Sequence, residues 1–222
     1  MIDGIFVELR AVENTDQARA MVHEQYGVYH RLAVRFELTP LIIESRTGYV
    51  LASFSGDSVW DYFRLESGRH VWRVEPPAGE TGRTRSATVY VDVLPAFGSA
   101  SPDLNQEDLE FISAPAGEEI TLSKKKRERI GSIVEIRHIP TDISVRASYS
   151  IEQWFNQTMA LLALKAKVAA YERGQRTPSR TALRQAEKVR TIDLKKQLVT
   201  DHRTSRTASV PQFLSGDIQS LN

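Results

Sequence analysis

Cysteine is absent from the 222 residues of the chain. Its absence excludes disulfide-stapled folds, zinc sites built on thiolates, and cysteine nucleophiles. No run of about 18 apolar residues occurs, and a membrane-spanning helix requires such a run. The first ten residues, MIDGIFVELR, are too short and too polar for a secretory signal peptide. The simplest prediction is a cytoplasmic protein with no membrane partner.

Motifs that bind cofactors are missing as well. The sequence has no Walker loop, no Rossmann glycine pattern and no nucleophile elbow. Its histidines show no metal-ligand spacing; they are His23, His30, His70, His138 and His202. We therefore expect neither a metal ion nor an organic cofactor.

What the sequence does contain is an ordinary globular composition, with 41% hydrophobic and 26% charged residues. Its formal net charge of +1 hides an asymmetry. Residues 124–206 carry 19 Lys+Arg against 8 Asp+Glu, and the remainder carries 10 against 20. This imbalance predicts that the basic part faces a polyanion, with nucleic acid as the leading candidate. A helical region with a solvated basic face is the alternative interpretation.

Hydrophobic periodicity in the first half predicts a sheet with helices packed against it. A helix is expected over 16–32, where Thr15 or Asp16 could cap it. A second, short helix follows Ser55-Gly56-Asp57. Alternation of apolar and polar residues indicates the strands, which are 4–10, 34–43, 49–54, 70–75 and 87–93.

The second half predicts a strand, a long connection, a hairpin and helices. The strand is 109–112, and segments 133–139 and 143–148 flank a turn at 140–142. A helix is expected over 151–173, with Trp154, Leu161 and Leu162 on its apolar face, and a basic helix over 181–190. The fold class predicted for the whole chain is α+β.

A set of short motifs is spread along nearly the whole chain, and we call their positions the signature residues. They include Glu66-Ser67-Gly68, His70, Arg73-Val74, Pro76, Gly82-Arg83, Leu94-Pro95, Ser55-Gly56-Asp57, the stretch 132–141, and Val199-Thr200-Asp201-His202-Arg203-Thr204. In these residues, and most specifically in segment 62–95, the sequence resembles class I peptide chain release factors, the proteins that read stop codons.

The resemblance implies two domains. Residues 1–104 together with 191–222 would form a codon-reading-type domain that includes the C-terminal tail. Residues 105–190 would form a second, catalytic-type domain, of the kind that reaches the peptidyl-transferase centre. Because Met1 nearly coincides with the first strand, the family's N-terminal helical domain is expected to be missing, which would make this a shortened relative.

Catalysis in this family depends on a Gly-Gly-Gln loop, whose glycines allow backbone conformations that help an amide N–H stabilise a developing oxyanion. Here the loop is degenerate and reads Ala116-Gly117-Glu118-Glu119, with no glutamine anywhere in 107–152. Two carboxylates beside a developing oxyanion have the wrong sign of charge. We therefore expect no catalytic residue and loss of peptidyl-tRNA hydrolysis.

The same connection carries a basic run, which consists of Lys124, Lys125, Lys126, Arg127 and Arg129. Such a run could neutralise several RNA phosphates in a salt-sensitive contact that does not depend on base sequence. A solvated run of charges is the alternative. The position that the resemblance gives this loop, against ribosomal RNA, favours RNA binding.

The codon-reading positions are altered too. Where the family has a tripeptide that discriminates bases, this chain has Pro76-Pro77-Ala78, which offers no side-chain hydrogen bond. The stacking histidine of the family falls at Arg85 and its threonine neighbour at Ser86. Arg85 could still stack on a base or bind a phosphate, so we expect it to contact RNA.

Together these features predict a release-factor-like protein that binds the ribosome or ribosomal RNA, with tRNA or mRNA as further candidates. It would modulate termination, block translation or rescue ribosomes without hydrolysing peptidyl-tRNA itself. One alternative is a ribosome-independent RNA-binding protein that acts on transcript stability. Others are a hydrolase whose loop is rebuilt around Gly117 and Glu119, and an adaptor for a protein partner. The oligomeric state and the codon or RNA recognised do not follow from the sequence.

Overall fold

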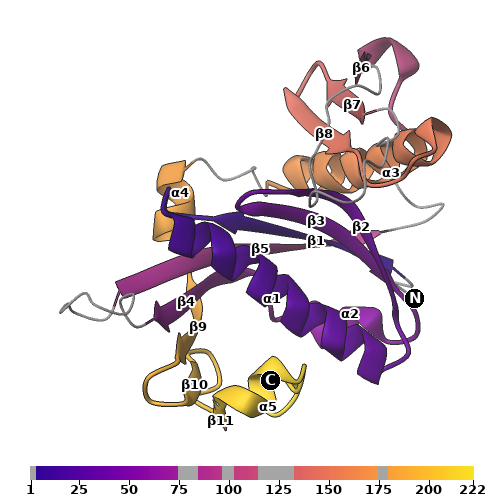
Figure 1. The fold of residues 1–222 in the computed structure, drawn as a ribbon. Helices are drawn as coiled ribbons and strands as arrows, with labels where there is room; N and C mark the ends of the chain where they lie inside the picture. Colours follow the sequence, from indigo (N-terminus) through magenta and orange to yellow (C-terminus); the bar gives the residue numbers. More distant parts are fainter. Residues whose placement is uncertain (1–3, 75–84, 97–102, 115–132, 175–179) are drawn as a thin grey trace, which may run out of the picture.

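The computed structural model describes residues 4–74, 85–96, 103–114, 133–174 and 180–222. They form an eight-stranded sheet of order β11-β10-β9-β4-β5-β1-β3-β2 and a three-stranded sheet of order β6-β7-β8 (Figure 1). This confirms the predicted α+β class. The elements are β1 (Gly4–Ala11), α1 (Asp16–Arg35), β2 (Thr39–Arg46), β3 (Tyr49–Ser55), α2 (Val59–Phe63), β4 (Gly68–Val74), β5 (Arg85–Ala96), β6 (Leu109–Ala114), β7 (Ile133–His138), β8 (Ile143–Ala147), α3 (Gln153–Glu172), α4 (Arg180–Gln185), β9 (Lys188–Asp193), β10 (Leu198–Asp201), β11 (Thr207–Ser209) and α5 (Val210–Leu214).

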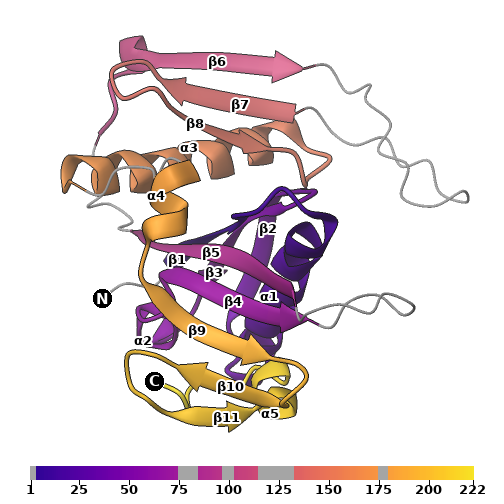
Figure 2. The ribbon, with the colours of Figure 1, turned by 90° about the vertical axis from the view of Figure 1, so that its left-hand side faces the viewer.

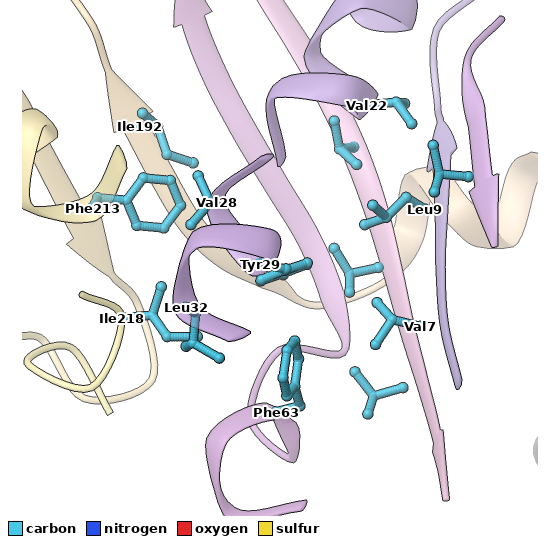
Figure 3. Packing of buried hydrophobic residues seen from close by; sticks show 14 of the residues in the cluster. Val7, Leu9, Val22, Val28, Tyr29, Leu32, Phe63, Ile192, Phe213 and Ile218 are labelled. Atoms are coloured by element: carbon cyan, nitrogen blue, oxygen red, sulfur yellow. The ribbon is translucent and has the colours of Figure 1, made fainter. Parts of the chain in front are cut away.

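One face of the large sheet is covered by α1, α2 and α5 (Figure 1). The hydroxyl of Thr15 caps α1 by accepting a hydrogen bond from the backbone N–H of Ala18 at 3.2 Å. The apolar stripe of α1 packs on the sheet, as Figure 3 shows. The labelled core residues are Val7, Leu9, Val22, Val28, Tyr29, Leu32, Phe63, Ile192, Phe213 and Ile218.

The boundary between α1 and β2 differs from the prediction. A strand was expected from residue 34, but α1 continues to Arg35 and β2 begins at Thr39. Leu32 and Ala33 are fully buried in the helical core, whereas Val34 is 65% exposed. The prediction was wrong because tertiary burial of the last helical turn outweighs the strand propensity of its β-branched valine.

The large sheet is completed by strands from distant parts of the chain. Strand β9 pairs in parallel with β4, with Arg73 opposite Asp193, and β10 and β11 follow as antiparallel neighbours. A basic helix was expected over 181–190, but α4 is only Arg180–Gln185 and β9 already begins at Lys188. The expected boundary between residues 190 and 191 falls inside β9, while the division into two domains stays a prediction.

Helix α3 lies between the two sheets (Figure 2). Its buried side is rich in alanine, which permits close packing on both sides of the helix; the buried residues are Asn156, Ala160, Ala163, Leu164, Ala166, Lys167, Val168, Ala169 and Ala170. The predicted apolar face, which also included Val168 and Ala169, is correct only in part: these two are buried, whereas Trp154 is 65% and Leu162 41% exposed. The hydrophobic cluster around α3 also contains four side chains of the large sheet, which are Phe6, Ile43, Leu51 and Leu94.

Candidate functional site

Two of the expected codon-reading positions, Arg85 and Ser86, lie at one end of the large sheet. Strands β4 and β5 are antiparallel, and Val74 is opposite Arg85 at the point where the chain leaves and re-enters the sheet. Pro76, Pro77 and Ala78 lie outside the described residues. Arg85 and Ser86 are both exposed at the start of β5. The structure therefore places these two at the mouth of the β4–β5 connection.

Further cations surround this mouth. Because β9 runs parallel to β4, the turn between β9 and β10 lies at the same end of the sheet, and Leu194 donates its backbone N–H to the carbonyl of Arg73 at 3.1 Å. We call the exposed cations at this end the cationic rim, which consists of Arg73, Arg85, Lys195 and Lys196. One rim guanidinium, that of Arg73, is 3.4 Å from the Asp193 carboxylate.

Sequence reasoning found only Arg85 of this rim. Lys195 and Lys196 follow β9, more than 100 positions beyond β4. They reach the mouth only through a parallel strand pairing, and parallel partners are joined by long crossovers that leave no local sequence pattern. The sequence feature that could have indicated them is the Lys195-Lys196 pair in the turn after β9.

The best-matched signature residues are buried in the interior of the large sheet's domain. Arg190 is fully buried and donates from Nη1 to Glu66 Oε2 at 2.6 Å, from Nε to Asp201 Oδ2 at 3.1 Å, and from Nη2 to Asn222 Oδ1 at 2.7 Å. The Tyr29 hydroxyl donates to the same Glu66 oxygen at 2.9 Å. This network, the Arg190 network, links α1, the start of β4, β9, β10 and the C-terminal tail.

Two other signature residues bind backbone rather than solvent. The buried His70 ring is 2.9 Å from the carbonyl of Glu66, and burial lowers the pKa of His70 to about 4. Arg203 donates to the carbonyls of Leu65 and Ser67, at 2.7 Å each. These contacts fix the turn that leads into β4. The signature residues are therefore a framework, and none of these groups is placed to attack a substrate.

Residues 115–132, which correspond to the family's catalytic loop, connect β6 to β7. These strands pair antiparallel, with Ala114 opposite Ile133 at the open end of the hairpin. The degenerate loop, with Ala116, Gly117, Glu118 and Glu119, and the basic run from Lys124 to Arg129 lie outside the described residues. The structure thus brings the two ends of the connection together and places them in the three-stranded sheet, on the opposite side of α3 from the large sheet (Figure 2).

Buried charges join the two sheets through α3. Glu8 of β1 accepts hydrogen bonds from Lys167 Nζ at 2.8 Å and from the Tyr49 hydroxyl at 2.6 Å, and Arg10 is 2.8 Å away. Burial alone would raise the pKa of Glu8, but Lys167 and Arg10 lower it to about 2. Opposite Glu8 in β5, burial and the Glu8 charge raise the pKa of Asp92 to about 6.

Beside these charges is a cavity of about 590 Å³. Its walls come from β1, β2 and β3 on one side and from β7, β8, the turn between them and α3 on the other. It is lined by Glu8, Arg10, Arg46, Tyr49, Glu135, Thr141, Asp142, Ile143, Ser144, Arg146, Lys167 and Tyr171. Sequence reasoning singled out none of these residues for function.

The described segments offer neither a metal-binding cluster nor a membrane-spanning helix. They contain no group of three or more His, Asp or Glu residues that could hold a metal ion. They also contain no helix long and apolar enough to cross a membrane. The cationic rim and the cavity beside Glu8, which we call the junction cavity, are the places where the described residues gather polar and charged groups; the β6–β7 connection lies outside the described residues.

The chain was compared with known proteins in sequence and in fold. No family model matches the chain. Curated relatives named peptide chain release factor 1 do match, with 28% identity over 235 residues in Anaeromyxobacter dehalogenans and 29% over 239 residues in Myxococcus xanthus. These alignments cover 98% of this chain and 62% and 64% of the relatives, so the chain spans less than two thirds of their length.

The fold matches a solved structure. RF2 of Thermus thermophilus superimposes with a TM-score of 0.82 over 99% of this chain and 66% of that one, at 22% sequence identity. The resemblance to release factors expected from the signature residues is thereby confirmed in sequence and in fold. The site residues themselves stay predictions.

Proposed function

We propose that this chain is a release-factor-like translation protein that binds the ribosome and modulates termination, blocks translation or rescues ribosomes without hydrolysing peptidyl-tRNA itself. Relatives named peptide chain release factor 1 and the shared fold support the connection with translation. The fold retains the framework formed by the Arg190 network, so the scaffold that would present recognition segments is present.

The observation that carries the loss of hydrolysis is the sequence between β6 and β7. At the position of the family's Gly-Gly-Gln loop the chain has Ala116-Gly117-Glu118-Glu119. An alanine replaces the backbone freedom of a glycine, and a carboxylate replaces a neutral amide. Negative charge next to a developing oxyanion opposes the reaction, because transition-state stabilisation requires hydrogen-bond donors or positive charge there.

Two basic surfaces would supply the RNA contacts. The cationic rim surrounds the β4–β5 connection, and the basic run belongs to the β6–β7 connection. Each Lys or Arg that neutralises a phosphate releases a counterion, so binding weakens as salt rises. We infer that both surfaces contact ribosomal RNA, one from each sheet.

Co-sedimentation with 70S ribosomes over a salt series tests the proposal. Wild type is expected to bind with strong salt dependence. Alanine at Lys124, Lys125, Lys126 and Arg127, or glutamine at Lys195 and Lys196, should weaken binding and flatten its salt dependence. The matched control is Arg64→Gln, which removes an exposed cation directly after α2 that pairs with Asp61. Failure to bind ribosomes at any salt concentration contradicts ribosome binding.

A peptide-release assay on programmed ribosomes tests the missing hydrolysis. No release above background is expected from wild type. Release that disappears in Glu119→Ala would instead establish a hydrolase with a rebuilt loop. Crosslinking that recovers one particular transcript, with no ribosomal RNA, would support the ribosome-independent RNA-binding function.

A further inference from the structure

Two of the arginines that line the junction cavity, Arg46 and Arg146, have side-chain donors without a hydrogen-bond acceptor among the described residues. Arg46, at the end of β2, forms no ion pair with any carboxylate of the described segments; its guanidinium carbon is 4.6 Å from the centre of the Tyr49 ring. Arg46 is exposed at the mouth of the cavity, whereas Tyr49 is largely covered. Within the described residues, its guanidinium makes no hydrogen bond and no ion pair, and its contact is the face of the Tyr49 ring.

Arg146 of β8 lines the opposite wall. Its Nε is 3.6 Å from Glu44 Oε1, too far for a hydrogen bond, and this buried Nε has no hydrogen-bond partner within the described chain. The contact is an ion pair without a hydrogen bond, and the other oxygen of Glu44, Oε2, accepts a hydrogen bond from the Ser148 hydroxyl. Because a buried donor without an acceptor is costly, Arg146 is a second indication that something else binds here.

The other charges of the cavity are already paired. Glu8 is shared by Arg10 and Lys167, each at 2.8 Å. Asp142 is 2.6 Å from Arg137, which does not line the cavity. Of the lining carboxylates, only Glu135 makes no ion pair within the described segments. Arg46 thus makes no ion pair within the described residues, and Arg146 pairs with Glu44 only at 3.6 Å, without a hydrogen bond from its Nε.

From this arrangement we infer that the junction cavity is a nucleotide-binding site, in which Arg46 and Arg146 bind the phosphate from opposite walls. Arginine is suited to this role because its planar fork matches phosphate oxygens and donates two parallel hydrogen bonds. The proposal is independent of ribosome binding and adds a ligand to the protein.

The size of the cavity and its other lining residues fit a nucleotide better than inorganic phosphate. The cavity volume of about 590 Å³ lies within the range of small-molecule sites and far exceeds what one phosphate fills. Tyr171 is partly exposed at the wall and can pack against a base. The Glu135 carboxylate and the Ser144 hydroxyl, which make no other hydrogen bond in the described chain, can accept from ribose hydroxyls or an exocyclic amine.

A ligand at this place contacts both layers of the structure. Arg46 and Tyr49 belong to the large sheet, whereas Arg146 and Tyr171 belong to the three-stranded sheet and α3. A molecule bound to both walls stabilises their association by mass action, so its occupancy should raise the melting temperature. The phosphate could come from a free nucleotide or from a nucleotide within an RNA strand, and the experiment separates these sources.

Calorimetric titration and thermal unfolding of the full chain test the inference. The probes are AMP, GMP, CMP, UMP, pyrophosphate, inorganic phosphate and a single-stranded RNA hexamer of mixed sequence. At least one nucleotide probe is expected to bind and raise the melting temperature. R46Q and R146Q should each weaken that binding by roughly tenfold or more, because each removes a charge-assisted hydrogen bond.

The control variant is Arg64→Gln, which should bind like wild type. The melting temperatures of the unliganded R46Q and R146Q variants show whether they fold. Binding of the hexamer alone, lost in both variants, assigns the phosphate to RNA and still supports the site. Absence of binding by any probe at millimolar concentration overturns the inference, as does binding that neither variant changes.

Discussion

Glu8 of β1 and Lys167 of α3 form an ion pair of 2.8 Å, with side chains only 4% and 7% exposed. The two residues are 159 positions apart in the chain and join the large sheet to the helix that carries the second sheet. Tyr49 and Arg10 complete the environment of the same carboxylate. A buried pair of this kind is costly to break, because removing one partner leaves the other charge uncompensated.

Replacing Lys167 by methionine should therefore destabilise the protein by about 3 kcal/mol. Urea unfolding measures the loss. The matched control is Lys165→Met, which removes a lysine whose partner Asp103 is fully exposed, and which should cost at most about 1 kcal/mol. Equal losses at positions 165 and 167 would contradict this account.

Asp92 makes stability depend on pH in the opposite direction from most carboxylates. Its folded-state pKa is raised from 3.8 to about 6, so the native state holds this proton more tightly than the unfolded chain. That contribution is complete below about pH 4 and is lost as the pH rises through 6. Asp92→Asn should thus match wild type at pH 4 and be more stable at pH 8, by up to about 3 kcal/mol.

Unfolding midpoints of wild type and Asp92→Asn, measured in urea from pH 4 to pH 8, provide the check. Asp103→Asn, a change at an exposed aspartate, should show nearly the same difference from wild type at every pH. If the advantage of Asp92→Asn were constant across this range, the raised pKa would not be its cause.

The Arg190 network should be the most sensitive polar site in the large sheet's domain. Arg190→Met leaves the carboxylates of Glu66 and Asp201 buried without their shared cation, at a cost of about 3–5 kcal/mol. Arg190→Lys keeps the charge but loses the fork that reaches three acceptors, so it should also destabilise, by a smaller amount. Denaturant unfolding followed by tryptophan fluorescence reports both, because Trp72 is buried in the same core.

For comparison, Arg64→Met removes an exposed arginine whose partner Asp61 is also exposed. It should change the free energy of unfolding by less than about 1 kcal/mol. A similar small effect for Arg190→Met would show that the network does not hold these elements together.

Gly68 begins β4 at a position that only glycine fits. Its φ is +134°, and a Cβ there would lie 2.5 Å from Val189 Cγ2 and 2.9 Å from the carbonyl oxygen of Glu187. Gly68→Ala should therefore separate β4 from β9 and cost about 3 kcal/mol or more, from backbone strain and overpacking together. Gly174→Ala is the control, because it has φ +85° but no atom within 4 Å, and should cost only about 1 kcal/mol.

Thermal unfolding of the two alanine variants distinguishes strain from packing. Equal melting temperatures would mean that the close approach of β4 and β9 contributes nothing, and that the backbone conformation alone matters.

The sequence was most informative where local pattern and burial agree. Strands β1, β3, β7 and β8 were predicted within a residue or two. In β7 and β8 the alternation matches one buried face, whereas β1 and β3 are buried on both faces and were found from their β-branched and other apolar residues. It was least informative for α3, which is packed on both sides. There the small residues face inward and Trp154 faces out, so the largest apolar side chains indicated the wrong face.

For the candidate sites, the sequence predicted residues that form local motifs, but not contacts between residues far apart in the chain. The signature residues could be found from spacing, yet their role as partners of Arg190 depends on contacts such as Glu66–Arg190, 124 positions apart. Lys167 was hidden because a lysine in a helix is usually solvated, and only its packing against Glu8 shows otherwise. The residues of the β6–β7 connection stay predictions.

The parallel pairing of β4 with β9 has a consequence for the order of events during synthesis. Residues 97–187 connect β5 to β9, and β9 then pairs with the other side of β4, the strand between them in the sheet. When the first 96 residues have emerged from a ribosome, β4 is an unpaired edge, and Arg190 has yet to be made. Such an edge is prone to wrong association, and contacts this distant form slowly. Completion of the nascent large sheet must therefore wait for the last 35 residues, about a sixth of the chain.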